Sequence, residues 1–215
     1  MQDDPKHLVE KGYDQIAPRY LKWSTPSPAR MGYLQKLLER LPPRAQVLEL
    51  GCGAGIPCTQ ILTQQAQVTG IDISATQIEL AKQHVPNAVL WQADMMSLTF
   101  SPGTFDAIVA FYSIIHLPRA EQPILINRLS GWLRPGGYLL MNLGTANDPG
   151  SIEPDWLGTA MYWSSYDVQT NQEMIRRAGF TILETEILLD DEDEEPVPFL
   201  WILAAADADR PSHSF

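Results

Sequence analysis

A glycine-rich turn follows the first strongly apolar segment of the chain. Residues 47–57 read VLELGCGAGIP, so an expected strand runs into Gly51, Gly53 and Gly55 and then into the start of a helix. Glycines have no Cβ and let a ligand approach the backbone closely. A helix N-terminus offers free N–H groups to anionic ligand groups. The turn therefore predicts a binding site for a nucleotide-like ligand.

The spacing of the glycines separates two kinds of nucleotide site. A dinucleotide fingerprint has the form G-x-G-x-x-G/A. Here the third small residue, Gly55, comes one position early, and Ile56 occupies the last position of the fingerprint. The spacing therefore disfavours a nicotinamide-dependent dehydrogenase.

Two acidic residues follow the next two expected strands. Asp72 ends the segment 70–72, and Asp94 comes after the third strand. Open α/β sheets bind ligands at the carboxyl ends of their strands, where Asp72 would accept hydrogen bonds from the hydroxyls of a ribose. The alternative is that both carboxylates only cap helices or turns. The helix after Asp72 begins with Ser74-x-x-Gln77, which is the pattern of a capping box.

Short apolar segments alternate with helical ones along most of the chain. Such alternation predicts βαβ units and a parallel sheet covered by helices on both faces. The expected strands are residues 46–50, 68–71, 88–91, 105–111, 138–143, 180–189 and 199–204, and the expected helices are residues 57–64, 75–84, 119–133 and 167–178. Only the acidic run 190–195 joins the last two strands. Because this run is too short for a crossover, these two strands must pair antiparallel.

Two further helices are expected before the first strand. Residues 4–5 and 27–28 each place a capping side chain before a proline at the first helical position. The first helix should kink or end near Pro18, which lacks a backbone N–H. The second should stop at the proline pair 42–43.

The composition limits the partners. The 215 residues include 15 Lys plus Arg against 26 Asp plus Glu, a formal net charge of -11. Nucleic acids and anionic membranes attract clustered cations, so this balance disfavours both. No apolar run reaches the roughly 20 residues of a membrane-spanning helix, and the first residues lack a signal-peptide pattern. We expect one cytoplasmic domain over residues 1–206 and a loose tail over residues 207–215.

The motifs, in their order, resemble those of class I S-adenosylmethionine-dependent methyltransferases of the small-molecule type. The resemblance covers about residues 10–206 and is carried by Glu49-x-Gly51-x-Gly53-x-Gly55, Gly70-Ile71-Asp72, Ala93-Asp94-Met95, Phe105 to Val109 running into His116-Leu117, Leu133 to Gly137, and Tyr13-Asp14-x-Ile16-Ala17-x-x-Tyr20. It implies an α/β fold with a Rossmann-like, doubly wound, seven-stranded sheet. The sheet should be mostly parallel with an antiparallel last strand, and residues 1–43 should form an N-terminal helical lid.

The resemblance also implies which residues bind S-adenosylmethionine and its product S-adenosylhomocysteine. The glycine loop should face the methionine part, Asp72 the ribose, and Asp94 with the Met95 backbone the adenine. The expected cofactor-binding residues are Tyr20, Glu49, Gly51, Gly53, Gly55, Asp72, Ile73, Asp94, Met95 and Phe111. No metal is expected.

Methyl transfer from a sulfonium is an in-line displacement, for which alignment of the reactants is the main contribution of the protein. A general base is optional for an amine or thiolate acceptor. His116 is the candidate base because it follows the fourth strand and an unperturbed imidazole titrates near neutral pH. The alternative is a structural histidine that is hydrogen-bonded to the backbone.

Residues 144–166 are expected to form a long loop that covers the substrate. Its aromatic side chains would line an apolar pocket with hydrogen-bonding tips, or would only pack the loop against the sheet. The expected substrate-pocket residues are Tyr13, Tyr112, Trp156, Trp163 and Tyr166. The acidic run 190–195 is interpreted as a solvated turn at the same edge of the sheet, with steering of a cationic acceptor as the alternative.

The sequence thus predicts methyl transfer to an O, N, S or C atom of a small molecule. The Asn/Asp-Pro-Pro-Tyr/Phe motif of enzymes that methylate adenine or glutamine amides is missing, because the fourth strand continues into residues 111–114, FYSI. This further disfavours nucleic-acid and protein-amide substrates. A cofactor-binding pseudoenzyme or regulatory module on the same fold is the alternative function, and the acceptor and the oligomeric state stay open.

Overall fold

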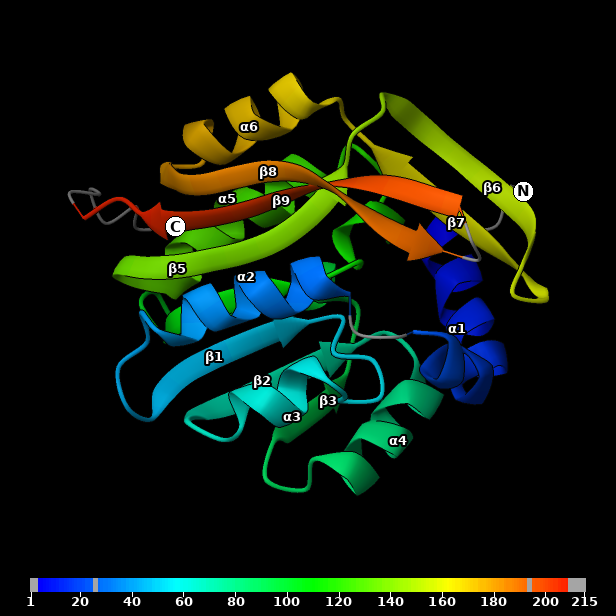
Figure 1. The fold of residues 1–215 in the computed structure, drawn as a ribbon, viewed down its shortest axis with the longest axis horizontal. Helices are drawn as coiled ribbons and strands as arrows, with labels where there is room; N and C mark the ends of the chain where they lie inside the picture. The colour runs from blue at the N-terminus through cyan, green and yellow to red at the C-terminus, as the bar shows by residue number, and fades with distance from the viewer. Residues whose placement is uncertain (1–3, 25–26, 193–194, 209–215) are drawn as a thin grey trace.

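The sheet of the computed structural model has seven strands in the order β3-β2-β1-β4-β5-β9-β8 (Figure 1). The structure describes residues 4–24, 27–192 and 195–208. From one edge to the other the strands are β3 (Val89–Gln92), β2 (Ala66–Asp72), β1 (Ala45–Leu50), β4 (Phe105–Ala110), β5 (Leu133–Gly144), β9 (Glu195–Ala206) and β8 (Phe180–Glu192). β1 lies between β2 and β4, so the strand order reverses on either side of β1. This reversal places the carboxyl end of β1, and the glycine loop after it, where open α/β sheets bind ligands.

β9 is the antiparallel strand of the sheet. It pairs antiparallel with both β5 and β8, while the pairs among β1 to β5 are parallel. The predicted antiparallel pairing of the last two strands is therefore confirmed. Both strands are longer than expected, so most of the acidic run 190–195 belongs to strand ends, and residues 193–194 lie outside the described part of the chain.

Helices cover both faces of the sheet, as the alternating pattern predicts (Figure 1). On one face, α2 (Pro28–Leu38) and α3 (Cys58–Leu62) pack on a core that includes Val47 and Trp201. On the other, α5 (Gln122–Trp132) and α6 (Val168–Arg177) pack on a core that includes Leu48. The neighbours Val47 and Leu48 belong to opposite cores because side chains of a strand alternate between the two faces.

The helix α1 (Pro5–Trp23) lies across the carboxyl edge of β1 and β2 (Figure 1). Asp4 caps its first turn by accepting a hydrogen bond from Lys6 N–H, as the sequence predicts. Of the two outcomes predicted at Pro18, a helix end there is wrong, since the helix continues through that residue to Trp23. The buried residues Ile16 and Ala17 hold the helix against its neighbours directly before the proline, and packing outweighs the loss of one backbone hydrogen bond.

The segment 144–166 is a β-hairpin and not the expected loop. It contains β6 (Asp148–Trp156) and β7 (Thr159–Ser165), which pair with each other in a separate sheet. Leu157 and Gly158 form the turn with φ angles of 52° and 89°, which suits a two-residue hairpin. The sequence does not predict this hairpin because β6 is exposed along almost its whole length and shows no alternation of apolar and polar residues. The hairpin packs on α1 through Met161 and Tyr162.

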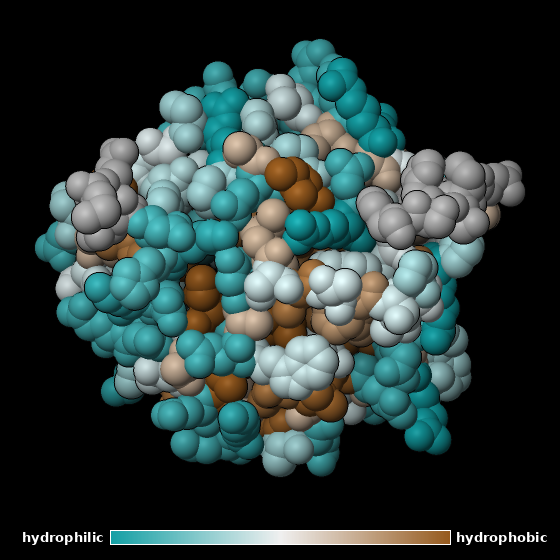
Figure 2. All heavy atoms as spheres, turned by 180° about the vertical axis from the view of Figure 1, so that it is seen from behind, coloured by the Kyte–Doolittle hydropathy of each residue, from teal (hydrophilic) through white to brown (hydrophobic). Residues whose placement is uncertain are grey.

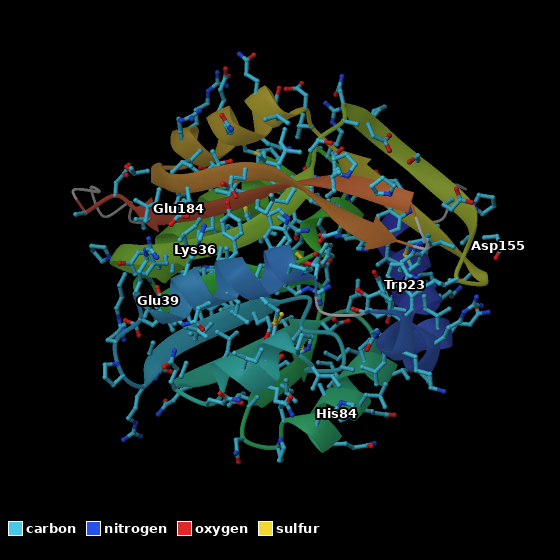
Figure 3. The ribbon with its side chains drawn as sticks, viewed as in Figure 1. Trp23, Lys36, Glu39, His84, Asp155 and Glu184 are labelled. Carbon is cyan, nitrogen blue, oxygen red and sulfur yellow. The ribbon has the colours of Figure 1, made fainter. Side chains whose placement is uncertain are left out.

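The outer surface carries isolated ion pairs and small apolar patches. Lys36 of α2 and Arg40, two residues after the end of α2, bind Glu184 of β8 at 2.6 and 3.0 Å, and Figure 3 shows Lys36 beside Glu184 on that side of the molecule. Such exposed pairs contribute at most about 1 kcal/mol each.

Figure 2 shows a largely hydrophilic rear face with apolar side chains grouped near its centre. Within the described residues, no helix has the length and apolar character needed to cross a membrane.

Candidate active site

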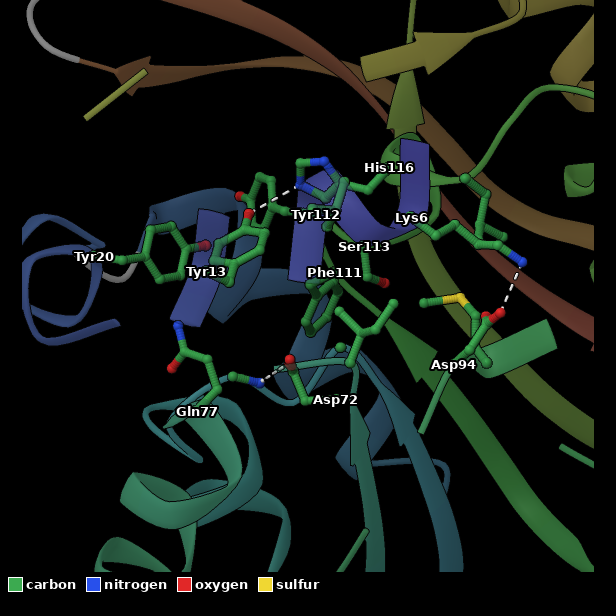
Figure 4. Close-up of a pocket in the computed structure, with 16 residues that line it drawn as sticks. Lys6, Tyr13, Tyr20, Asp72, Gln77, Asp94, Phe111, Tyr112, Ser113 and His116 are labelled. Carbon is green, nitrogen blue, oxygen red and sulfur yellow. Dashed lines mark hydrogen bonds and ion pairs between the residues drawn. The ribbon is translucent and has the colours of Figure 1, made fainter. Parts of the chain in front are cut away.

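Three adjoining pockets lie at the carboxyl edge of the sheet, beneath α1 and the hairpin. The edge pocket is lined by residues at the carboxyl end of β2 and after β3, including Asp72 and Asp94 (Figure 4). The loop pocket runs along the glycine loop. The aromatic pocket lies between α1, α2 and the hairpin. Tyr20 and Tyr112 line all three, so the three spaces meet at these two side chains.

The glycine loop and Asp72 are joined by backbone hydrogen bonds. Gly53 N–H donates to Asp72 Oδ2 at 2.8 Å, and Ser74 N–H donates to Oδ1 at 2.9 Å. Burial raises the pKa of Asp72 to about 6, against the opposing effect of these N–H groups. Each carboxylate oxygen keeps a second lone pair for a ligand hydroxyl. The carboxylate is thus held in place at the pocket wall.

Gly51 has no room for a side chain. Its φ is +76°, and an added Cβ would overlap the Cβ of Ser113. Ser113 is itself fixed, because its hydroxyl donates to Leu50 C=O at 2.8 Å. The third glycine of the motif serves packing instead. A Cβ on Gly55 would lie 2.6 Å from Val85 Cγ2, and Gly55 does not line the pockets described above.

Gln77 of α4 (Ala75–His84) is a pocket residue that the sequence pattern did not reveal. Its side chain is buried, lines the edge pocket, and has no hydrogen-bond partner for Oε1 or Nε2 among the described residues (Figure 4). The capping box forms only in part: Ser74 Oγ accepts from Gln77 N–H, but Ser74 N–H is already bound to Asp72. The Gln77 amide is therefore left to face the pocket, and a buried unpaired amide is costly unless a ligand satisfies it.

Gln77→Leu is expected to separate stability from ligand binding. Leucine has a similar volume and no polar side-chain atoms. The free energy of unfolding of the variant should therefore be about 1 kcal/mol higher than that of the wild type. It should also bind S-adenosylhomocysteine about tenfold more weakly, because the ligand loses its amide partner. Chemical denaturation and titration calorimetry measure the two effects. Lower stability together with unchanged affinity would show that Gln77 has only a packing role.

Asp94 connects α1 to the sheet. Its Oδ1 accepts from Met96 N–H at 2.8 Å at the start of the short helix η1 (Met95–Ser97), and its Oδ2 binds Lys6 Nζ at 2.7 Å. Lys6 also binds Glu121 Oε2 at 3.1 Å. These ion pairs connect the first turn of α1 to Asp94 and Glu121 at the edge pocket (Figure 4). Lys6 is a second pocket residue without a sequence signal, since its partners are 88 and 115 positions away in the chain, by their numbering.

The loop pocket is also lined by two ionisable side chains, Glu49 from β1 and Arg30 from α2. Glu49 accepts a hydrogen bond from Thr59 Oγ1 at 2.6 Å, and burial raises its pKa to about 7. Arg30 is also buried, and its guanidinium carbon lies 4.6 Å from the centre of the Tyr112 ring. The lining of the loop pocket therefore includes one cationic and one acidic group. Arg30 has no motif around it in the sequence, which is why only the structure identifies it.

His116 lies in the short helix η2 (Ile114–His116) and is almost completely buried. Its Nδ1 lies 2.8 Å from Tyr162 C=O, which only accepts hydrogen bonds, so Nδ1 carries the proton. Burial lowers the pKa of His116 to about 4, which keeps the ring neutral at pH 7. Its Nε2 therefore accepts from the Tyr13 hydroxyl at 2.9 Å (Figure 4). Both nitrogens are occupied, and Tyr13 is the member of this pair with the greater access to the pockets.

Aromatic rings form the wall of the aromatic pocket. Trp156 lies at the centre of the group, with ring centroids 5.9 Å from Tyr13, 5.8 Å from Tyr20, 5.6 Å from Trp23 and 5.3 Å from Trp163. These distances are typical of packed aromatic pairs. The expected pocket role of Trp156 and Trp163 thus agrees with their positions, and Trp23 joins them from the end of α1.

Tyr112 and Tyr166 have different surroundings. The hydroxyl of Tyr112 donates to Asp190 Oδ2 at 2.6 Å at the end of β8, and Tyr112 N–H donates to the buried Asn142 at 2.7 Å. Tyr166 lies away from the three pockets: its hydroxyl donates to Arg119 C=O, and the Arg119 guanidinium stacks on its ring. The structure therefore does not bring Tyr166 to the site.

The other expected site residues gather as the sequence suggests. The edge pocket is lined by Tyr13, Tyr20, Gly51, Gly53, Asp72, Ile73, Asp94, Met95, Phe111, Tyr112 and His116. The loop pocket adds Glu49. Gly55 and Tyr166 are the two members of the expected set that line none of the three pockets.

Comparison with known proteins agrees with this geometry. Residues 47–137 match the protein family described as "Methyltransferase domain". Methyltransferase GfsG of Streptomyces halstedii is 30% identical over 178 residues, which cover 76% of this chain and 62% of that protein. Trans-aconitate 2-methyltransferase of Deinococcus radiodurans is 37% identical over 112 residues, 51% of this chain and 42% of that protein. The matches thus span less than two thirds of the length of these curated relatives.

Solved structures share the fold. The 1,6-didemethyltoxoflavin-N1-methyltransferase of Burkholderia thailandensis, with bound 1,6-didemethyltoxoflavin and S-adenosylhomocysteine, aligns with a TM-score of 0.72 at 17% identity, over 94% of this chain and 88% of that one. Residues 47–137 thus match a methyltransferase domain, and the sheet order and the glycine loop agree with the fold of the solved methyltransferase structure.

Proposed function

We propose that the protein transfers the methyl group of S-adenosylmethionine to a small-molecule acceptor. The observation that carries this proposal is the meeting of three pockets at Tyr20 and Tyr112, at the carboxyl edge of the sheet. A methyl transfer needs two sites that hold cofactor and acceptor in line, with a shared boundary where the reacting atoms meet. The junction has this arrangement.

The residues fit the cofactor in two of the pockets. In the edge pocket, Asp72 and the unpaired Gln77 amide would bind the ribose hydroxyls, and Asp94 with the Met95 backbone would bind the adenine. In the loop pocket, Arg30 would bind the carboxylate of the methionine part, and Glu49 would face its ammonium group.

The acceptor would enter the aromatic pocket. S-adenosylmethionine supplies an activated methyl group on a sulfonium, so the protein has mainly to orient the acceptor and exclude water. Tyr112 has a φ of +50°, which is rare for a bulky residue. Strained backbone of this kind is typical of functional positions, and Asn142 and Asp190 hold the Tyr112 main chain and side chain in this conformation.

His116 would act through Tyr13 and not by direct contact with the acceptor. The neutral Nε2 accepts a hydrogen bond from the Tyr13 hydroxyl, and Tyr13, which lines both the edge and the aromatic pockets, is the member of the pair that would contact the acceptor. An acceptor hydroxyl or ammonium would pass its proton to the Tyr13 oxygen while Tyr13 passes its own to His116. The low pKa of His116 makes this a modest aid, so the tyrosine–histidine pair serves mainly to position the acceptor.

Tyr13→Phe is expected to lower kcat by about 10–100-fold while leaving the affinity for S-adenosylhomocysteine unchanged. His116→Ala should have a similar effect on kcat, because Tyr13 then loses its hydrogen-bond partner. Because the pKa of His116 is about 4, the wild-type kcat should fall only as the pH drops toward that value, with no His116 titration near pH 6.5. A wild-type rate in the Tyr13→Phe variant would remove this role.

The proposed activity is tested by product formation. Purified protein is incubated with S-adenosylmethionine and panels of amines, phenols, thiols and carboxylates, and S-adenosylhomocysteine is quantified by mass spectrometry. Acceptor-dependent formation of S-adenosylhomocysteine and of a methylated product is the expected result. Cofactor binding without any methylated product across the panels would favour a pseudoenzyme or regulatory module instead.

A further inference from the structure

The aromatic pocket contains a carboxylate oxygen that no described residue satisfies. Asp190 is 5% exposed and lines this pocket. Its Oδ2 accepts from the Tyr112 hydroxyl, but its buried Oδ1 has no hydrogen-bond partner among the described residues. A buried carboxylate oxygen without a donor is costly, so the arrangement points to a ligand that brings a donor to it.

The walls around this carboxylate are suited to a cation. Trp23, Trp156 and Trp163 line the pocket together with Tyr13 and Tyr20. Aromatic faces attract ammonium groups, most strongly where water is excluded. The formal net charge of -11 also favours the approach of a cationic small molecule over an anionic one.

Among the described residues, two charged side chains line the aromatic pocket, and we assign one to the cofactor and the other to the acceptor. Arg30 and Asp190 are the charged side chains among the residues that line it. Arg30 also lines the loop pocket beside Glu49, where the cofactor carboxylate is placed above. Asp190 lines only the aromatic pocket among the three, which leaves its charge for the acceptor.

We propose that the acceptor is an organic amine that is protonated in solution, and that Asp190 is its recognition residue. The ammonium N–H donates to Asp190 Oδ1 while the alkyl or aryl body of the amine packs against the tryptophan rings. Before transfer the nitrogen gives this proton to Asp190, and the freed lone pair then forms the new bond to the methyl carbon. This inference rests on the proposed methyltransferase function, since it names the chemical class of the acceptor. The names of the relatives do not select one class, because phosphoethanolamine, trans-aconitate and 1,6-didemethyltoxoflavin differ chemically from one another.

The test compares neutral, cationic and anionic probes of one shape. Phenethylamine, 2-phenylethanol and phenylacetate are titrated against the protein saturated with S-adenosylhomocysteine, and binding is followed by tryptophan fluorescence and calorimetry. Phenethylamine is expected to bind about tenfold more tightly than 2-phenylethanol. Equal binding of the two, or preference for phenylacetate, would overturn the proposal.

Two variants assign the preference to Asp190. Asp190→Asn keeps an oxygen that accepts from Tyr112 but removes the charge, so the preference for phenethylamine should fall to about that of the neutral probe. Glu79→Gln removes the same charge at an exposed position of α4, outside the three pockets, and should keep the full preference. A preserved preference in Asp190→Asn contradicts the assignment. Failure of S-adenosylhomocysteine itself to bind would instead reject the proposed function.

Discussion

Asp72→Asn is expected to weaken binding of S-adenosylhomocysteine by about 10–100-fold at pH 7.5. The substitution keeps the size of the side chain but removes the negative charge that would accept the ribose hydroxyls. Hydrogen bonds to a charged group contribute about 1.5–3 kcal/mol each, and 1.4 kcal/mol corresponds to a factor of ten in affinity. Titration calorimetry measures the loss, and a melting curve of each protein confirms that the fold is retained.

The pH dependence gives this prediction a second readout. Burial raises the pKa of Asp72 to about 6 in the free protein, whereas a bound ribose favours the ionised form. Affinity should therefore be highest above pH 6 and should fall as the pH decreases through 6, by up to about tenfold per pH unit. Glu49, with a pKa raised to about 7, titrates in both proteins. Because the Asp72 charge contributes to this raised pKa, the Glu49 step should move to lower pH in Asp72→Asn, whereas the step near pH 6 should disappear.

The same comparison also has a clear contradicting outcome. If Asp72→Asn binds S-adenosylhomocysteine as tightly as the wild type and with the same pH profile, Asp72 only holds the glycine loop through Gly53 N–H and Ser74 N–H. Glu79→Gln serves again as the charge control, since Glu79 is exposed on α4.

Gly51→Ala is expected to cause the largest combined loss of stability and binding. The φ of +76° costs an L-residue about 1–2 kcal/mol. The added methyl group would also overlap the Ser113 side chain, whose hydroxyl is bonded to Leu50 C=O. Overpacking in such a site adds about 1–3 kcal/mol. We expect a fall of about 3 kcal/mol in the free energy of unfolding and no detectable binding of S-adenosylhomocysteine, because the loop must move.

Gly32→Ala provides the matched control. Gly32 lies inside α2, and a Cβ built there meets nothing within 4 Å. Alanine is favoured over glycine in a helix by about 1 kcal/mol, so this variant should be slightly more stable than the wild type and bind normally. Chemical denaturation distinguishes the two variants. Wild-type stability and affinity in Gly51→Ala would mean that the loop tolerates a side chain and does not define the pocket as described.

Local sequence patterns predicted the parts of the fold that depend on local physics. The alternation of short apolar segments and helices predicted the sheet with helices on both faces, and the short connection after β8 predicted the antiparallel β9. Capping by Asp4 and Ser27 was also correct, because these side chains bond to backbone N–H groups only two or three residues away.

The errors have a common physical origin in contacts between distant segments. α1 runs through Pro18 because packing of Ile16 and Ala17 outweighs one missing hydrogen bond. The hairpin was read as a loop because the exposed β6 has no alternating pattern and its turn begins with Leu157, a residue that rarely adopts positive φ.

The residues of the candidate site likewise divide into those predicted from local sequence patterns and those placed by contacts between distant segments. Asp72, Asp94 and the glycines follow strand ends in the sequence and could be predicted from that position. Lys6, Arg30 and Asp190 come from segments whose approach to the pockets depends on the whole fold. Gln77 was visible as part of a capping box, but Asp72 already occupies the Ser74 N–H, which redirects the Gln77 side chain to the pocket.

The central claim is that the carboxyl edge of this sheet binds S-adenosylmethionine. Titration calorimetry of the wild-type protein with S-adenosylhomocysteine, and in parallel with NAD, tests it most directly. We predict one site for S-adenosylhomocysteine with a Kd on the order of 1–100 µM, in the usual range of enzyme–substrate affinities, and no binding of NAD. Binding of NAD without binding of S-adenosylhomocysteine, or no binding of either at about 1 mM, would contradict it.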